Sequence, residues 1–388
     1  MRVGGAVAIG LFVLVGACTS ASSITTTTLA SPTSTSPAVS FTTQGQNATT
    51  VAPTTTTTEV LPDEPIVAAG WSLQSGDLLV SGHDGVRVVR DGAVVSQPVT
   101  SPVELTLDDG YGGILFTTPR PELFPDHWPI LFGGGGYVIW RLSPDGSLEK
   151  LHDSGDSGWS LGAIDLSRVD LLSLRLGEPP TLLYTQVERI GSTDQYSDTR
   201  EAVVALTLGP PWEPPGNPIK LPIETPGEGG VTGLGFQETE GRLIMSTASD
   251  GGGWLSAWTA DGSPLAWATN PIPEGTPCPD DPGFSHCLWS ATTVPGTSLI
   301  AYLETDAHRN KTDLVIYDTT TGAEQHKLQI PTNGAIYVEN IHASATQIVI
   351  SRLAYESSAY RYLPMLLVDV ETGAINELPI TGIATLVR

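Results

Sequence analysis

The residues of this chain that could do chemistry include a glycine-flanked serine, seven histidines and three cysteines. Residues 158–162 read Gly-Trp-Ser-Leu-Gly, which matches the Gly-x-Ser-x-Gly pattern of a serine nucleophile. That motif works where a strand turns sharply into a helix and exposes the serine, and residues 163–168 have no helical pattern. A turn between two strands therefore fits Ser160 better than a catalytic role.

The histidine spacing does not indicate a zinc hydrolase, because neither His-x-x-x-His nor His-Glu-x-x-His occurs. Residues 133–136 are consecutive glycines, but they precede no predicted helix and so form no phosphate-binding loop. The sequence therefore predicts no catalytic residue, no metal site and no cofactor. Acidic residues are numerous, so a pair of carboxylates inside the fold stays an alternative.

Cys18 follows a short apolar segment near the start of the chain. The apolar run of residues 6–15 is far shorter than the ~20 residues that span a bilayer as a helix. A positive charge, a short apolar core and small residues are typical of a secretory signal. Residues 15–18, Val-Gly-Ala-Cys, resemble the bacterial lipobox. This resemblance implies that residues 1–17 are a lipoprotein signal peptide and that the Cys18 thiol is acylated. The alternative is an ordinary signal peptide with an incidental cysteine.

Residues 18–62 consist mainly of Thr, Ser, Pro, Ala and Val. Such a segment has no large apolar face to bury, so we predict a disordered linker. Acyl chains on Cys18 would attach this linker to the membrane. The sequence thus predicts a protein on the extracytoplasmic face of the cell membrane, with its folded part held away from the bilayer.

The chain has 18 Lys and Arg residues against 42 Asp and Glu residues, a formal net charge of −24. A surface this acidic repels the phosphates of nucleic acids, so we exclude nucleic acid as a partner. It also favours a soluble folded part, for which we expect a monomer.

Cys278 and Cys287 lie nine residues apart in a chain that carries an export signal. Exported proteins reach compartments where disulfides persist, so we predict a bond between these two cysteines. A metal site that adds Asp280, Asp281 and His286 is the alternative. It is less favoured because this mixture of hard and soft ligands fits no standard zinc set.

A β-hairpin pattern recurs six times in residues 63–388. Each copy has an apolar strand, a tight turn with a glycine and a returning strand. The turn glycines are Gly92, Gly146, Gly262, Gly322 and Gly373. The double gap after the second glycine contains an altered copy, in which residues 210–218 replace the turn. Two further strands precede each hairpin, which makes four strands per unit at a period of about 50–65 residues.

Radial repetition of four-stranded sheets is typical of a β-propeller. The turns at residues 318–322 and 369–373 resemble those of WD-repeat-like, quinoprotein-like and Tol-type bacterial propellers. The resemblance covers residues 65–388 and implies an all-β fold, a six-bladed β-propeller of four-stranded antiparallel blades. Two stacked β-sandwich domains are the alternative. The ring could be closed by residues 66–72 or by residues 382–388, which are both strand-like.

Three insertions depart from the regular blade and contain side chains that are common in binding sites. Loops on a rigid scaffold often carry recognition, and Trp, Tyr and Arg are favoured anchors. The candidate binding residues are Arg120, Phe124, His127, Trp128, Arg189, Tyr196, Arg200 and Trp212. The alternative is that these side chains pack on the propeller and stabilise it.

The sequence therefore predicts a lipid-anchored propeller that serves as a non-enzymatic binding or scaffold platform for a protein or glycan of the cell envelope. A glycan hydrolase or lyase that uses carboxylates of the central channel is one alternative, and a sensor or regulator domain is another. Neighbouring carboxylates in a concave site would favour the enzyme, whereas a channel of Ser, Thr and apolar groups would argue against it.

Overall fold

The computed structural model describes residues 64–119, 138–153, 169–189, 199–210, 213–223, 230–249, 252–273, 288–306, 311–331, 336–356 and 359–388. The chain divides into two units, residues 1–58 and 59–388, and all described residues belong to the second. In these ranges every regular element is a β-strand. No helix that is long and apolar enough to cross a membrane occurs there.

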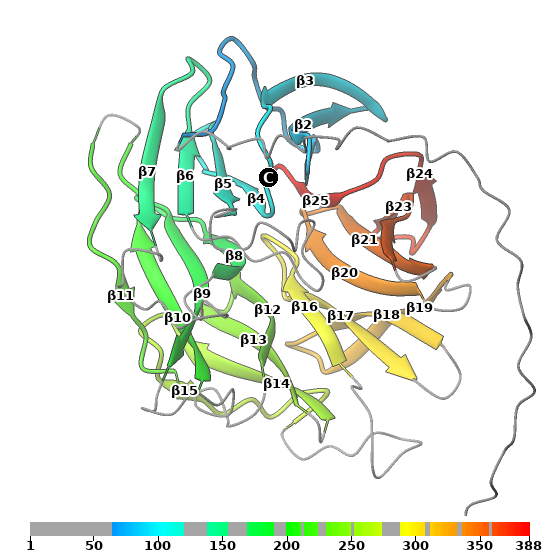
Figure 1. Cartoon of the computed structure of the whole chain (residues 1–388). Coiled ribbons are helices and arrows are strands. Elements are labelled where there is room, and N and C mark those ends of the chain that lie inside the picture. Colours follow the sequence, from blue (N-terminus) through cyan, green and yellow to red (C-terminus); the bar gives the residue numbers. More distant parts are fainter. Residues whose placement is uncertain are drawn as a thin grey trace, which may run out of the picture. The chain divides into compact units, whose positions relative to one another are not determined.

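The strands form six antiparallel sheets around a common centre, and each sheet is one blade (Figure 1). From the centre outwards, blade 1 contains β25 (Ile383–Leu386), β1 (Leu78–Gly82), β2 (Gly85–Arg90) and β3 (Ala93–Val99). In the same order, blade 2 contains β4 (Thr106–Asp108), β5 (Ile114–Thr118), β6 (Val138–Leu142) and β7 (Leu148–Asp153). Blade 3 contains β8 (Val169–Arg175), β9 (Thr181–Arg189), β10 (Thr199–Thr207) and β11 (Ile219–Lys220).

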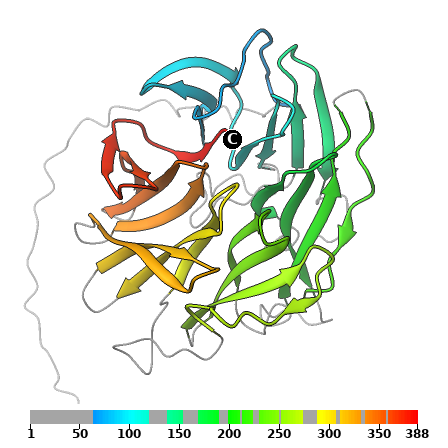
Figure 2. The ribbon, with the colours of Figure 1, turned by 180° about the vertical axis from the view of Figure 1, so that it is seen from behind.

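The remaining three blades complete the ring, which Figure 2 shows from behind. Blade 4 contains β12 (Gly230–Gln237), β13 (Arg242–Ser249), β14 (Gly252–Thr259) and β15 (Pro264–Leu265). Blade 5 contains β16 (Leu288–Thr293), β17 (Leu299–Asp306), β18 (Lys311–Asp318) and β19 (Ala323–Ile330). Blade 6 contains β20 (Ile336–Ala343), β21 (Gln347–Glu356), β23 (Met365–Asp369) and β24 (Ile375–Leu378), and β22 (Ala359–Tyr362) also pairs with β21. The six-bladed propeller predicted from the sequence is confirmed.

The hairpin repeat is the local basis of this fold. The turn glycines Gly92, Gly146, Gly262, Gly322 and Gly373 have φ angles between +70° and +88°. Glycine reaches this region without the steric cost that a Cβ atom would bring, which explains why the turns repeat it. The altered sixth copy is also present, because β10 pairs with the short strand β11 across residues 208–218.

The ring is closed by the second of the two candidate segments. β25 is the innermost strand of blade 1 and pairs antiparallel with β1, with Leu78 opposite Leu386. Ile383, Ala384 and Leu386 are buried, as an inner strand between two blades requires. Residues 66–72 instead follow the outer edge of blade 1, where Val67 bridges to Val99. The chain ends of the propeller therefore meet in one blade.

The hydrophobic core lies between the blades. It consists of six apolar clusters, and each of them joins residues of two neighbouring blades. The cluster between blades 2 and 3, for example, includes Leu107 and Ile139 from blade 2 and Leu182 and Leu206 from blade 3. Each sheet thus buries one face against the blade before it and the other face against the blade after it.

The strand order defines two faces of the propeller. Because neighbouring strands are antiparallel, the connections between first and second strands and between third and fourth strands leave from one side, which we call the turn face. All other connections leave from the opposite side, which we call the loop face. Short connections such as residues 238–241 and 319–322 belong to the turn face. The described strands that flank residues 120–137, 154–168, 190–198 and 274–287 end on the loop face.

Gly233 tests how closely the inner strands pack. A Cβ atom at this position would lie 2.3 Å from the carbonyl oxygen of Ala291 and 2.4 Å from its nitrogen, so β12 and β16 would have to separate. We expect Gly233→Ala to lower the free energy of unfolding by about 1–3 kcal/mol. Gly216→Ala is the control, because its Cβ would make only ordinary contact with Thr207 at 3.4 Å. Urea unfolding measures both, and equal midpoints for the two variants would contradict the close approach.

Candidate functional site

Two of the eight candidate binding residues lie on described strands. Arg189 ends β9 and Arg200 lies near the start of β10, where Arg189 pairs with Thr199 and Arg200 pairs with Glu188. The backbone thus brings both arginines to the loop-face end of blade 3. The predicted residues outside the described ranges are Cys18, Arg120, Phe124, His127, Trp128, Ser160, Tyr196, Trp212, Cys278 and Cys287.

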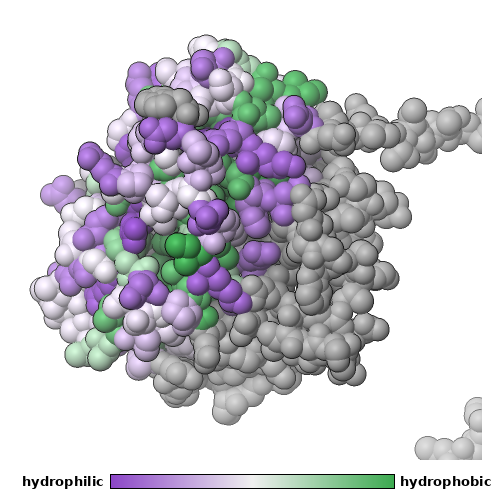
Figure 3. All heavy atoms as spheres, turned by 90° about the vertical axis from the view of Figure 1, so that its left-hand side faces the viewer, coloured by the Kyte–Doolittle hydropathy of each residue, from purple (hydrophilic) through white to green (hydrophobic). Residues whose placement is uncertain are grey.

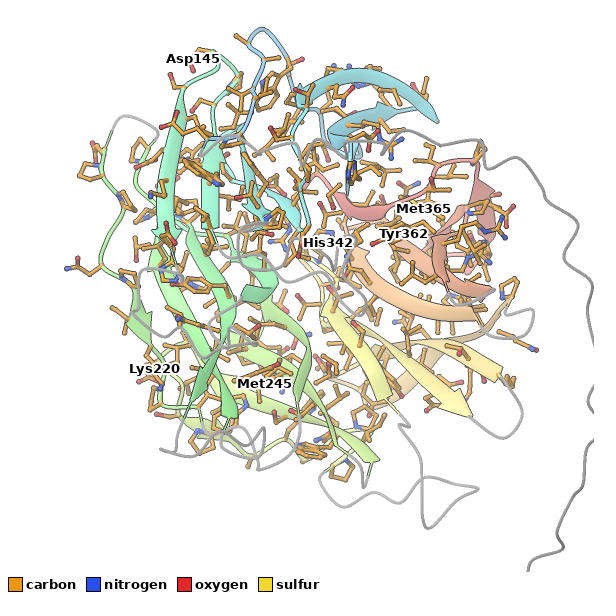
Figure 4. All side chains as sticks on the ribbon, viewed as in Figure 1. Asp145, Lys220, Met245, His342, Tyr362 and Met365 are labelled. Carbon is orange, nitrogen blue, oxygen red and sulfur yellow. The ribbon has the colours of Figure 1, made fainter. Side chains whose placement is uncertain are left out.

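The inner edge of the closing strand is hydrogen-bonded by side chains of blade 6. His342, which Figure 4 places near the centre of the ring, accepts a hydrogen bond at Nδ1 from the backbone N–H of Leu386 (3.1 Å). Ser351 accepts at Oγ from the N–H of Ala384 (3.0 Å), and Asn340 donates to the Ala384 carbonyl (3.3 Å). These side chains provide the backbone partners that a further strand would otherwise supply.

Backbone carbonyl groups of other inner strands also accept hydrogen bonds from side chains of another blade. The bonds are Thr385 Oγ1 to Thr106 O (3.1 Å), Thr293 Oγ1 to Phe236 O (3.1 Å) and Arg388 Nη1 to Leu174 O. The first joins blades 1 and 2, the second joins blades 4 and 5, and the third reaches from blade 1 to blade 3. Polar side chains of the inner strands therefore have a structural task, because they satisfy buried backbone groups of a neighbouring blade.

Most buried polar side chains of the described inner strands are hydroxyls. The buried polar residues of these strands are Thr106, Asp108, Ser173, Gln237, Ser290, Thr292, Thr293, His342 and Thr385. Asp108 is the one carboxylate in this set. The set covers only described side chains, and those of Asp170 on β8 and Glu339 on β20 lie outside it, so the glycan-hydrolase alternative stays open.

Asp108 and His342 are both influenced by Arg388. Burial raises the pKa of the Asp108 carboxyl, and the positive charge of Arg388 opposes this rise. Asp108 Oδ1 accepts from the Gly110 N–H (3.2 Å), whereas Oδ2 has no hydrogen-bond partner in the part of the chain that the structure describes. Burial, and then Arg388, lower the pKa of His342 to about 3. His342 is therefore neutral near pH 7, with its proton on Nε2, because Nδ1 accepts from Leu386.

A buried ion pair of blade 2 is hydrogen-bonded to blade 3 close to the turn face. Arg141 is 2% exposed and donates from Nε to Asp109 Oδ2 (2.8 Å) and from Nη1 to the carbonyl of Gly209 (2.7 Å). Asp109 Oδ1 accepts from the N–H groups of Tyr111 and Gly113, both at 2.7 Å. The carboxylate is thus bonded on both oxygens. Loss of one partner from such a pair typically costs about 3–5 kcal/mol, because the other charge stays buried.

Further polar groups line the same seam between blades 2 and 3. Glu149 Oε2 lies 4.0 Å from Arg141 Nη1, and burial raises the pKa of this carboxyl. The rings of His152 and Tyr184 face each other with centroids 5.2 Å apart. Burial lowers the pKa of His152 and raises the pKa of Tyr184. His152 Nε2 and the Tyr184 hydroxyl are buried and make no hydrogen bond within the described ranges.

No sequence motif marks this seam, because its members are far apart along the chain. An unsatisfied buried polar atom costs about 1–3 kcal/mol, so several of them at one seam indicate a further hydrogen-bond partner. Ordered water or a bound ligand commonly satisfies such atoms.

No protein-family model and no curated protein matches the sequence. Three solved structures show a similar course of the chain. A chain of the nidogen/laminin complex has 9% identity and a TM-score of 0.49, over 80% of this chain and 98% of that one. TolB from Acinetobacter baumannii has 11% identity and a TM-score of 0.49, over 80% of this chain and 65% of that one. The β-propeller domain of Cps50 (Swd1) from Myceliophteria thermophila has 11% identity and a TM-score of 0.41, over 82% and 99%. The six-bladed assignment rests on the strand order of this chain.

His342 should make the stability of the ring depend on pH. The fold binds the neutral imidazole, whereas the unfolded chain takes up a proton near pH 6.5, so stability is full above pH 6.5 and declines towards pH 3. We expect a loss of about 2–3 kcal/mol between pH 7.5 and 4.5. His342→Gln keeps an acceptor for the Leu386 N–H but does not titrate.

Denaturant unfolding of both proteins at the two pH values measures this difference. The pKa of Asp108 is raised in the fold, so its contribution to the free energy of unfolding increases as the pH falls, whereas that of His342 decreases. The Asp108 contribution is common to both proteins and cancels in the comparison. An identical pH dependence of wild type and His342→Gln would contradict the role given to His342.

Proposed function

We propose that this protein is a lipid-anchored, extracytoplasmic β-propeller that binds a protein or glycan of the cell envelope through its loop face. The observation that carries this proposal is the unequal length of the connections on the two faces. The three longest connections, residues 119–137, 154–168 and 266–287, lie on the loop face, which also has short turns such as residues 83–84 and 250–251. On the turn face the longest connection is residues 208–218, which includes Trp212, and residues 109–113 and 319–322 are typical of the others. Long connections on a rigid scaffold are the usual place for recognition.

The scaffold suits this role because its blades are fixed to each other. Apolar clusters fill every seam, and the inner edges are joined by side-chain hydrogen bonds such as those of Thr385 and Thr293. Residues on rigid elements are held in a defined geometry, which lowers the entropy that binding must remove. Arg189 and Arg200, which the β9–β10 pairing brings together, are the described residues that we place in the binding surface.

The location rests on the sequence of the first residues. The lipobox-like residues 15–18 support acylation of Cys18, and the Ser/Thr/Pro-rich residues 18–62 support a linker between the lipid and the propeller. The net charge of −24 favours a soluble folded part that stays clear of anionic lipid headgroups.

Photo-crosslinking from the two faces tests the binding surface. Asp84 lies in the loop-face turn of blade 1 and Asp145 lies in a turn-face hairpin of blade 2, and both are exposed aspartates in tight turns. We expect p-benzoylphenylalanine at position 84 of the full chain to give crosslinked products in intact cells. The same residue at position 145 should give several-fold less, because Asp145 lies on the opposite face. Equal yields from both positions, or products only from position 145, would remove the loop face as the binding surface.

The anchor is tested by Cys18→Ser. We expect this variant to move from the membrane fraction to the soluble fraction, because it loses the thiol that would carry the acyl chains. Cys278→Ser is the matched control and should stay with the membrane. Mass spectrometry of the wild-type protein should find the acyl groups on Cys18. Processing that is unaffected by globomycin would refute the lipid anchor and leave the propeller's binding role to be judged by the crosslinking result.

A further inference from the structure

The seam between blades 2 and 3 gathers buried polar atoms that have no hydrogen-bond partner among the described residues. They are Arg141 Nη2, Glu149 Oε2, His152 Nε2 and the Tyr184 hydroxyl. The first two belong to the ion-pair network with Asp109 and lie beside opposite charges. The last two take part in no ion pair that the structure gives for the described residues, although the charge of Asp153 acts on the pKa of His152, so they are the atoms that need a further hydrogen-bond partner.

His152 faces this seam because β7 is irregular. The pairing of β6 with β7 shifts in register between Ile139, which is opposite His152, and Trp140, which is opposite Lys150. Leu151 is the extra residue. Its side chain packs on the apolar cluster between blades 2 and 3, and the adjacent His152 ring contacts Tyr184 of blade 3. The bulge thus turns two consecutive side chains towards blade 3, which a regular strand would not do.

Tyr184 provides the second polar group from the opposite blade. It lies on β9, is fully buried and belongs to an apolar cluster that includes Leu107, Leu174 and Leu206. A buried tyrosine hydroxyl normally has a hydrogen-bond partner. The centroid of the Tyr184 ring lies 5.2 Å from the centroid of the His152 ring, and the two ring planes are tilted by 41°.

We propose that His152 and Tyr184 form a small binding site for one hydroxyl group, which bridges His152 Nε2 and the Tyr184 oxygen. A neutral imidazole and a phenol each offer one donor or one acceptor, and a hydroxyl supplies the complement of both. A charged group would have to lose its hydration against the apolar cluster around Tyr184, which disfavours an ionic ligand. The hydroxyl can come from a neutral ligand, such as an alcohol or sugar, or from one ordered water.

The site lies towards the outer side of the ring, although its two polar atoms are themselves buried. His152 is half-buried, and β7 is the outermost strand of blade 2. Figure 3 shows this side of the propeller, where hydrophobic residues lie among a larger number of hydrophilic ones. The site is independent of loop-face binding, because the seam uses strands β7 and β9 and none of the candidate loop residues.

The experiment follows the His152 imidazole in the full-length protein. Histidine labelled with ¹⁵N gives long-range ¹H–¹⁵N signals, and His152→Gln assigns the His152 signal by its loss. Ethylene glycol is the probe, and 1,2-dimethoxyethane is the control because it accepts hydrogen bonds but cannot donate one. We expect ethylene glycol to shift the Nε2 signal of the wild type, with a response at least five-fold smaller in Tyr184→Phe.

Tyr302→Phe is the matched protein control. Tyr302 is a similarly buried tyrosine of the cluster between blades 4 and 5, so its loss should leave the His152 response unchanged. Unfolding curves of the two Tyr→Phe variants verify that both are folded. If the Tyr184 variant fails to fold, Tyr184→Met retains an apolar side chain without the hydroxyl and serves instead.

The outcomes separate the two sources of the hydroxyl. A shift with ethylene glycol but not with the ether supports a ligand hydroxyl. An Nε2 signal that ignores both probes, but shows a nuclear Overhauser contact to a long-lived water that Tyr184→Phe abolishes, supports an ordered water. An Nε2 signal that is the same in wild type and Tyr184→Phe, with no probe response and no such water, overturns the proposal.

Discussion

The constraint on which this structure depends is the free inner edge of each blade. Six innermost strands point unpaired N–H and C=O groups towards the centre of the ring, where a further strand cannot be added. The chain satisfies such groups with side chains of the adjacent blade, as His342 does for Leu386 and Thr385 does for Thr106. Short hydroxyl side chains suit this task because they reach a neighbouring backbone without filling the limited space. Polar residues in the interior of the propeller are therefore part of its framework before they can be part of any site.

Buried charged residues are likewise limited to positions where partners surround them. The buried Arg141 donates hydrogen bonds to Asp109 and to the Gly209 carbonyl. Asp109 in turn accepts hydrogen bonds from two N–H groups of its own turn. This network and the apolar clusters hold adjacent blades in register. A scaffold fixed in this way can present connections of very different length without changing its strands. The division into a turn face and a loop face follows from strand order alone, which is why architecture indicates where binding is expected but not what is bound.

Much of the fold could be predicted because its information is local. A turn that needs positive φ selects glycine, and Gly92, Gly146, Gly262, Gly322 and Gly373 made the repeat and its period visible. Ring closure could not be assigned, since residues 66–72 and 382–388 are both apolar and strand-like, and only packing between blades decides which lies inside. The His152–Tyr184 seam was missed for a related reason. It depends on a one-residue bulge at Leu151 and on a residue of another blade, and neither leaves a pattern in sequence. The binding residues on the insertions were predicted only from their residue types, and most of them lie outside the described ranges.

The closing strand also has a consequence for how the protein comes into being. Blade 1 takes β1, β2 and β3 from residues 78–99 but its inner strand from residues 383–386, so almost the whole propeller sequence separates strands that must pair. A nascent or truncated chain that stops before Ile383 leaves the edge of β1 uncovered, with Leu79 and Val80 beside it. Uncovered apolar edges invite aggregation and proteolysis. The pairing of β25 with β1 thus makes the complete fold depend on translation through residue 386. An incomplete translation product would expose the unpaired edge of β1, which chaperones and proteases could recognise.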